Sequence, residues 1–225
     1  MGLDSRMRSG VCCLVKNAGL LGSVASQVCA LVTLCIPQWL TFSPGLLESE
    51  KYMLGLWGMC VTQDTGGSVC QASASPGSLA SEMLVARILM CVTCITGSCG
   101  LVAILLGLTH LGSGGHQGSS LERRMNIAGG ALFFLAGLTT LAPVSYVARV
   151  TVQKFWGPEL PTNVPRWEYG NALFSGWIGG VFLLTGGLLL IMSQLYADRL
   201  AETLPSLPSK LDLSSKVPFG KVDFT

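Results

Sequence analysis

The sequence predicts a membrane protein: a left-handed bundle of four transmembrane helices with a small extracellular antiparallel β-sheet. Only 12% of the 225 residues are charged and 50% are hydrophobic, whereas a soluble domain carries about 25% charged residues. Four separate stretches are apolar over about 20 residues, the length that crosses a bilayer as a helix. This composition excludes a disordered chain. A net charge of +2 leaves no basic face for nucleic acid, so no nucleic-acid partner is expected.

The apolar stretches divide the chain into spans and connections. The predicted spans are residues 14–36, 84–108, 127–147 and 172–195. The third span is interrupted by Pro143, and the fourth contains no charged residue. The apolar core of the first stretch is longer than that of a cleavable signal peptide, which favours a retained anchor. The remaining segments are residues 1–13, 37–83, 109–126, 148–171 and 196–225.

Lysine and arginine residues predict the orientation, because they are enriched on the cytoplasmic side of a membrane. Nine of them lie around the amino terminus, in the 109–126 loop and in the tail, against four in the 37–83 and 148–171 loops. Both termini are therefore expected in the cytoplasm. The 37–83 and 148–171 loops become the first and second extracellular loops of a multi-pass protein.

The first extracellular loop contains two of the nine cysteines, Cys60 and Cys70. An extracellular loop is oxidising, so this pair is expected to form a disulfide; the alternative is two free thiols. Leu54, Leu56 and Cys60 alternate as in a strand, and residues 65–68 are typical of a turn. These features predict a small antiparallel sheet cross-linked by the disulfide.

Two other cysteines, Cys12 and Cys13, lie beside the first span on the predicted cytoplasmic side. Their position makes them candidates for palmitoylation; the alternative is two small residues at the start of a helix. The two histidines, His110 and His116, have no cysteine or carboxylate partners at metal-binding spacing, and no catalytic set is present. Neither an enzyme nor a bound cofactor is expected.

Several of these residues together resemble the signature of the claudin family. The first-loop part of the signature is Trp39, Gly55, Leu56, Trp57, Cys60 and Cys70, followed by Arg87 at the start of the second span. In the second loop, Phe155-Trp156 followed by Pro158, and then Arg166-Trp167-Glu168, are also similar. The Arg-Trp-Glu form resembles the non-classical members of the family.

The resemblance implies a tight-junction protein of the plasma membrane that mediates cell–cell adhesion and controls paracellular permeability, as a barrier or a weakly cation-preferring pore. Its partners would be membrane lipid, copies of itself and other claudins, within one membrane and across two. The terminal Thr225 is a poor filler of a PDZ pocket, so PDZ scaffold binding is disfavoured. The alternative is a non-junctional auxiliary or compaction protein of the wider PMP22/claudin superfamily.

The resemblance also gives roles to individual residues. Phe155, Trp156, Pro158 and Glu168 would form the loop that contacts a claudin on the opposite cell; the two aromatic residues could instead seat at the membrane interface. Asp64 is the candidate pore charge, because it lies between the two cysteines near the place where relatives carry one. Its alternative is an ordinary turn residue, since Asp is favoured at the start of turns.

The remaining signature residues have physical interpretations of their own. Trp39 and Trp57 are large amphipathic rings that suit the membrane–water boundary, with or without a protein partner. Arg87 is costly inside a bilayer. Near the outer end of its span, it is expected to snorkel or to bind carbonyl groups of the sheet; the alternative is a pore-lining role.

Overall fold

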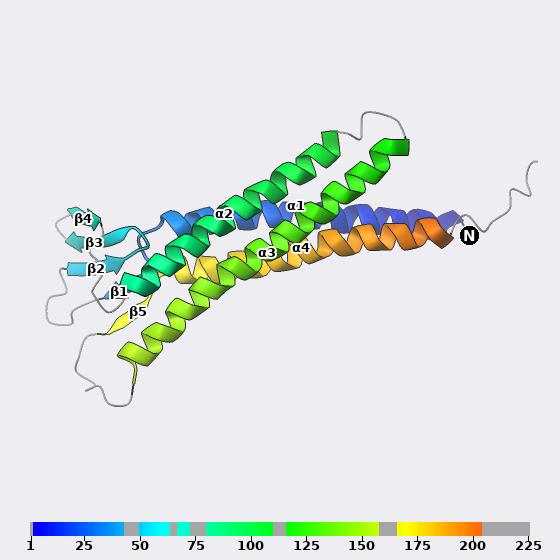
Figure 1. Cartoon of the computed structure of the whole chain (residues 1–225). Coiled ribbons are helices and arrows are strands. Elements are labelled where there is room, and N and C mark those ends of the chain that lie inside the picture. The colour runs from blue at the N-terminus through cyan, green and yellow to red at the C-terminus, as the bar shows by residue number, and fades with distance from the viewer. Residues whose placement is uncertain are drawn as a thin grey trace, which may run out of the picture.

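The computed structural model describes residues 2–42, 50–63, 67–72, 80–109, 116–157 and 166–203. Four helices lie side by side, and the sheet sits at one end of them (Figure 1). The helices are α1 (Gly2–Cys35), α2 (Ala80–Thr109), α3 (His116–Phe155) and α4 (Asn171–Thr203). The strands are β1 (Leu40–Phe42), β2 (Glu50–Leu54), β3 (Gly58–Gln63), β4 (Ser68–Ala72) and β5 (Trp167–Tyr169). The predicted four-helix membrane fold with a small antiparallel sheet is confirmed.

Within the described residues, four segments are long and apolar enough to cross a membrane as helices. They are Asn17–Cys35, Ser81–Gly107, Leu121–Phe155 and Asn171–Ala197. Their outward faces carry large apolar side chains such as Leu21, Ile95 and Phe182, each more than half exposed. An exposed apolar band of this extent suits contact with lipid rather than water.

The expectation that Pro143 interrupts the third span is wrong, because α3 continues through it to Phe155. A proline removes one backbone donor from a helix. Membrane helices tolerate this loss because neighbouring helices and hydroxyl side chains satisfy the freed groups. The uninterrupted helix carries the beginning of the second loop, residues 148–155, away from the bundle as helix.

Glycines allow the helices to approach closely. A Cβ on Gly180 would lie 2.7 Å from two side-chain carbons of Leu141, and one on Gly176 would lie 2.7 Å from Val144 Cγ2. Both glycines of this Gly-x-x-x-Gly motif therefore face α3. The motif serves packing within the chain, where small residues let membrane helices interlock.

The five strands form one antiparallel sheet in the order β4-β3-β2-β1-β5. The edge strand β5 comes from the second loop and pairs with β1, more than 120 residues earlier in the chain. The alternation inferred from Leu54 to Cys60 is wrong in detail. β2 ends at Leu54, the chain turns through residues 55–57, and β3 begins at Gly58.

Candidate functional site

The two faces of the sheet differ in chemistry. Residues paired across neighbouring strands point to the same face, and successive residues point to opposite faces. We call the face with Thr41, Lys51, Met53, Cys60 and Glu168 the polar face. The opposite, apolar face carries Leu40, Phe42, Tyr52, Leu54, Trp167 and Tyr169. Leu40 and Leu54 are fully buried there, in a cluster with residues from α2, α3 and α4.

The β2–β3 turn, Gly55-Leu56-Trp57, attaches the sheet to the helices. The Gly55 N–H donates to the Gly58 carbonyl and closes the turn. A Cβ on Gly55 would lie 2.6 Å from the Pro37 Cα atom, so only glycine fits against the chain entering β1. Leu56 is buried in the core between sheet and bundle. The turn is therefore a docking element rather than an exposed loop tip.

Arg87, on α2, holds this turn. Its Nε donates to the Leu56 carbonyl at 2.7 Å, and its Nη2 donates to the same oxygen. The guanidinium also lies 5.0 Å from the centroid of the Trp57 ring. Hydrogen bonds from a charged group and a cation–π contact are both stronger away from bulk water. The expectation that Arg87 binds a carbonyl of the sheet is thus met.

The two tryptophans of the signature occupy different environments. Trp39 is fully buried, and its Nε1 donates to the Thr33 carbonyl at 2.9 Å. Trp39 is therefore a core residue, and the expectation that its ring lies at the membrane–water boundary is wrong. Trp57 is about half exposed, and its Nε1 donates to the Leu34 carbonyl at 2.8 Å. Each indole therefore satisfies a carbonyl in the last turn of α1, where helical partners are missing.

The disulfide joins the two strands farthest from β5. Cys60 on β3 and Cys70 on β4 lie directly opposite each other, with Cα atoms 4.1 Å apart, and are bonded. β4 is an edge strand, and its described side chains from Ser68 to Gln71 are exposed. Because the strand buries so little surface, the covalent link supplies much of what holds it to the sheet.

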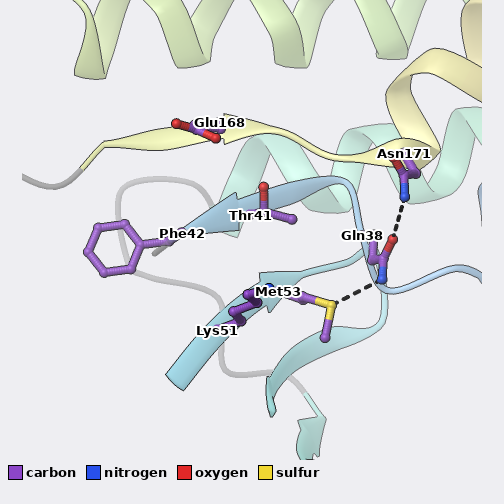
Figure 2. A pocket seen from close by; sticks show the side chains of 7 residues that line it. All are labelled: Gln38, Thr41, Phe42, Lys51, Met53, Glu168 and Asn171. Atoms are coloured by element: carbon purple, nitrogen blue, oxygen red, sulfur yellow. Dashed lines mark hydrogen bonds between the residues drawn. The ribbon is translucent and has the colours of Figure 1, made fainter. Parts of the chain in front are cut away.

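A hollow of about 320 Å³ lies over the polar face near β1, β2 and β5. Figure 2 shows Gln38 at one end, bridging the start of α4 to β2. Its Oε1 accepts from Asn171 Nδ2 at 3.1 Å, and its Nε2 lies 3.2 Å from Met53 Sδ. The hollow is lined by Gln38, Thr41, Phe42, Lys51, Met53, Glu168 and Asn171.

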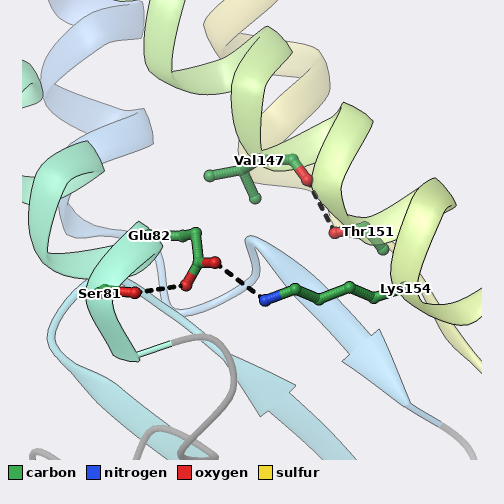
Figure 3. Close-up of polar contacts among 5 residues, drawn as sticks. All are labelled: Ser81, Glu82, Val147, Thr151 and Lys154. Atoms are coloured by element: carbon green, nitrogen blue, oxygen red, sulfur yellow. Dashed lines mark hydrogen bonds and ion pairs between the residues drawn. The ribbon is translucent and has the colours of Figure 1, made fainter.

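The first-loop carboxylates do not all face this hollow. Glu50 belongs to the opposite face, where it accepts hydrogen bonds from the Tyr52 hydroxyl at 3.0 Å and from Gln63 Nε2 at 3.1 Å. The carboxylate of Glu50 raises the pKa of Tyr52, chiefly through this hydrogen bond. Glu82 lies 2.8 Å from Lys154 Nζ and pairs α2 with α3 (Figure 3). The net charge of a whole loop therefore does not give the charge of one face of the sheet.

In the described part of the second loop, aromatic rings lie beside an arginine, Arg166. Phe155 is partly buried and packs on the core between sheet and bundle. Trp156 is about half exposed, and its Nε1 donates to the Trp167 carbonyl at 3.2 Å. The Arg166 guanidinium lies 5.0 Å from the Trp156 ring centroid. The expected aromatic pair thus separates into one core residue and one surface residue.

Comparison with known proteins identifies the family of this chain. The family model described as PMP-22/EMP/MP20/Claudin family matches residues 14–190. The chain belongs to this family. It is 32% identical to Claudin-7 of Homo sapiens over 188 residues, covering 82% of this chain and 86% of that one. It is 33% identical to Claudin-19 of Mus musculus, covering 92% and 100% of the two chains. Claudin-14 of Mus musculus is 32% identical, with 80% and 75% covered.

In this family member, the structure brings five of the signature residues together at one place, while Cys60 and Cys70 lie on β3 and β4. Trp39, the Gly55-Leu56-Trp57 turn and Arg87 meet where α1, α2 and the sheet join. Glu168 lies elsewhere, exposed on the edge strand β5 and lining the hollow. Asp64 and Pro158 lie outside the described residues, as do the side chains of Cys12 and Cys13, which fall within α1.

Of the seven residues that line the hollow, the sequence analysis singled out only Glu168; the six that it missed are Gln38, Thr41, Phe42, Lys51, Met53 and Asn171. Gln38 and Asn171 directly precede a buried tryptophan and a buried alanine, and the Ala172 N–H donates to the Gln38 carbonyl. No local pattern marks such residues, because their proximity depends on pairing between β1 and β5. Lys51 was counted only in the charge balance. Strand alternation places its side chain on the face opposite to that of Glu50, and the register decides which face each residue takes.

Proposed function

We propose that this chain is a tight-junction protein, with no catalytic activity, that joins neighbouring cells and controls passage between them. The observation that carries the proposal is a sheet built from both loops and held to one end of four membrane-length helices, with a hollow of polar and apolar side chains over its polar face. Family membership supports the same role. Its partners would be lipid, further copies of itself and other claudins. The sheet would lie outside the cell at the plasma membrane, with both termini in the cytoplasm.

Adhesion can be tested through Trp156, an exposed aromatic ring in the second loop. In cells that lack other claudins, we expect the chain to concentrate at cell–cell contacts and form strands visible by freeze-fracture. An aromatic anchor at an interface contributes about 2 kcal/mol, roughly a thirtyfold change in affinity. Trp156→Ala should therefore abolish most contact enrichment while surface expression stays unchanged.

Tyr196→Ala is the matched control, because Tyr196 is an exposed aromatic residue near the other end of α4. It should leave contact enrichment unchanged. A wild-type chain spread evenly between contacts and free edges, without strands, would argue against the junctional role. Equal losses from both variants would show that Trp156 is not an adhesion residue.

The permeability proposal concerns ions that pass along the polar face. Lys51 and Glu168 contribute opposite charges there, so a preference for cations requires a further carboxylate. Asp64 is our candidate, since carboxylates along a narrow water path attract cations. Dilution potentials across a monolayer should show a modest preference for sodium over chloride, reduced by Asp64→Asn. An anion preference, or unchanged conductance on expression, would leave a barrier role.

Orientation has a direct test in intact cells. The excess of basic residues on one side, nine against four, motivates the proposal that the sheet is extracellular. A tag inserted near Gly66 should bind antibody without permeabilisation, and a tag after Thr225 should bind only after it. The reverse staining pattern would overturn the proposed topology.

A further inference from the structure

Met53 is the one described methionine that lines the hollow. It lies on β2, opposite Thr41 on β1 and Cys60 on β3, so its side chain belongs to the polar face of the sheet. The side chain is partly exposed, beside a hollow of about 320 Å³. A water molecule in the liquid takes up about 30 Å³. A small solute such as hydrogen peroxide therefore has room to reach the sulfur.

A hydrogen bond fixes the orientation of this sulfur. Gln38 Nε2 donates to Met53 Sδ at 3.2 Å, and Figure 2 shows the two atoms facing each other. The Gln38 amide is held in turn by Asn171, whose Nδ2 donates to Gln38 Oε1 at 3.1 Å. A thioether sulfur is a weak acceptor with two lone pairs. The amide covers one lone pair and leaves the other to a reactant that enters from the hollow.

We propose that Met53 is an oxidation site of the sheet, converted by hydrogen peroxide to one epimer of methionine sulfoxide. The uncovered lone pair of Sδ attacks one peroxide oxygen, forming the S–O bond as the O–O bond breaks. The departing hydroxide takes the proton from the oxygen now on sulfur and leaves as water, and the sulfur has lost two electrons. A sulfoxide sulfur is a chiral centre, so attack at a single lone pair gives a single epimer.

The other methionines differ from Met53 in their surroundings. Met59 lies on the neighbouring strand β3, but it packs on the core between sheet and bundle. Four methionines whose side chains the structure describes lie in the membrane-crossing segments: Met83, Met90, Met125 and Met192. A peroxide molecule in water meets none of these sulfurs in a polar hollow. Met53 should therefore react first.

The product fits the place where it forms. Attack from the hollow leaves the new oxygen pointing into the hollow and keeps the Gln38 amide against the sulfur. Lys51 lies two residues earlier on β2, about 7 Å along the same face, and its ammonium group can donate to that oxygen. Oxidation turns an apolar side chain into a polar one. Here it changes the hollow without unpacking the core, so the melting temperature should move by less than about 2 °C.

The test uses the full-length chain in detergent, treated with hydrogen peroxide and followed by peptide mass spectrometry. Met53 should be oxidised at least about tenfold faster than Met59, because an oxidant must reach the sulfur. Each of the two methionine sulfoxide reductases accepts one epimer, so one of them should reduce about 90% or more of the Met53 sulfoxide in the released peptide. The chain unfolded before oxidation should give the two epimers in equal amounts.

A variant tests the role of the amide. Gln38→Ala removes the group that covers one lone pair, and the two epimers should then form in nearly equal amounts. Glu50→Gln is the matched control, because Glu50 lies on the same strand but on the opposite face, and it should keep the single epimer. Equal epimers in the folded wild type would overturn the inference without any variant. Equal oxidation rates at Met53 and Met59, or an unchanged epimer ratio in Gln38→Ala, would do the same.

A separate measurement connects the site with permeability, and this step alone rests on the proposed function. Peroxide added outside a monolayer that expresses the chain should change the ion conductance of the wild type and not that of Met53→Leu. Sulfoxide at Met53 with unchanged conductance would argue against the passage of ions along the polar face and would leave the oxidation site in place. Absence of the sulfoxide from the treated monolayer would overturn the oxidation site itself.

Discussion

Replacing Arg87 by alanine should lower the melting temperature of the detergent-solubilised protein by roughly 5–15 °C. The change removes two hydrogen bonds from a charged group to the Leu56 carbonyl and the contact with Trp57. Such hydrogen bonds contribute about 1.5–3 kcal/mol, and a cation–π contact about 0.5–2 kcal/mol. A loss of about 2–4 kcal/mol shifts the melting temperature of a chain of this size by the stated amount. The measurement is thermal unfolding followed by size-exclusion chromatography.

Two further variants separate the causes. Arg87→Lys keeps the charge but loses the forked geometry that lets guanidinium nitrogens share one oxygen, so it should recover only part of the stability. Arg149→Ala removes an exposed arginine from the same end of the bundle and should shift the melting temperature by less than about 2 °C. If Arg87→Ala behaved like Arg149→Ala, Arg87 would not hold the sheet to the helices.

Replacing Gly170 by alanine should be at least as damaging, at about 3 kcal/mol or more. Gly170 joins β5 to α4, and its N–H donates to the Trp39 carbonyl. An added Cβ would overlap the Gln38 carbonyl oxygen and lie 2.5 Å from the carbonyl carbon. Both atoms are backbone, so the strand must move away from β1. Overpacking of this kind commonly costs about 1–3 kcal/mol, and more where the backbone cannot yield.

The expected readout is a lower melting temperature together with reduced delivery to the cell surface. Gly157→Ala is the matched control in the same loop, because a Cβ there would make only an ordinary contact, 3.7 Å from the Gln153 carbonyl oxygen. It should leave both measurements unchanged. Wild-type stability in Gly170→Ala would mean that β5 does not pack against β1 as closely as described.

Both variants act on the same feature, the attachment of a small sheet to a helical bundle. Three or more strands with a covered apolar face are needed for a sheet to be stable. Here Arg87 and Trp57 hold the β2–β3 turn at one side, and Gly170 lets β5 close the other. The polar face, with the hollow over it, is displayed in a defined position only because both attachments hold.

The sequence alone determined the features of this protein that depend on the length and hydropathy of its apolar segments and on the oxidising environment of its first loop. Four apolar stretches predicted four helices, and the charge pattern around them predicted an orientation that awaits its test. Cys60 and Cys70 were paired because no other cysteine lay in the first loop, and the structure contains that bond. The cost of a charge in the membrane predicted that Arg87 would snorkel or bind carbonyls of the sheet, and the structure shows the second.

Only the tertiary structure decided which side chains share a face. β5 has three residues, too few for a strand pattern, and exists because β1 offers it a hydrogen-bonding edge. Glu50 and Lys51 are neighbours in sequence but belong to opposite faces, since side chains alternate along a strand and the register sets which face each takes. Trp39 and Trp57 are both indoles near one helix end, yet one is buried and the other is half exposed. These differences arise from pairing between distant segments, whose geometry is not encoded in any local stretch of the chain.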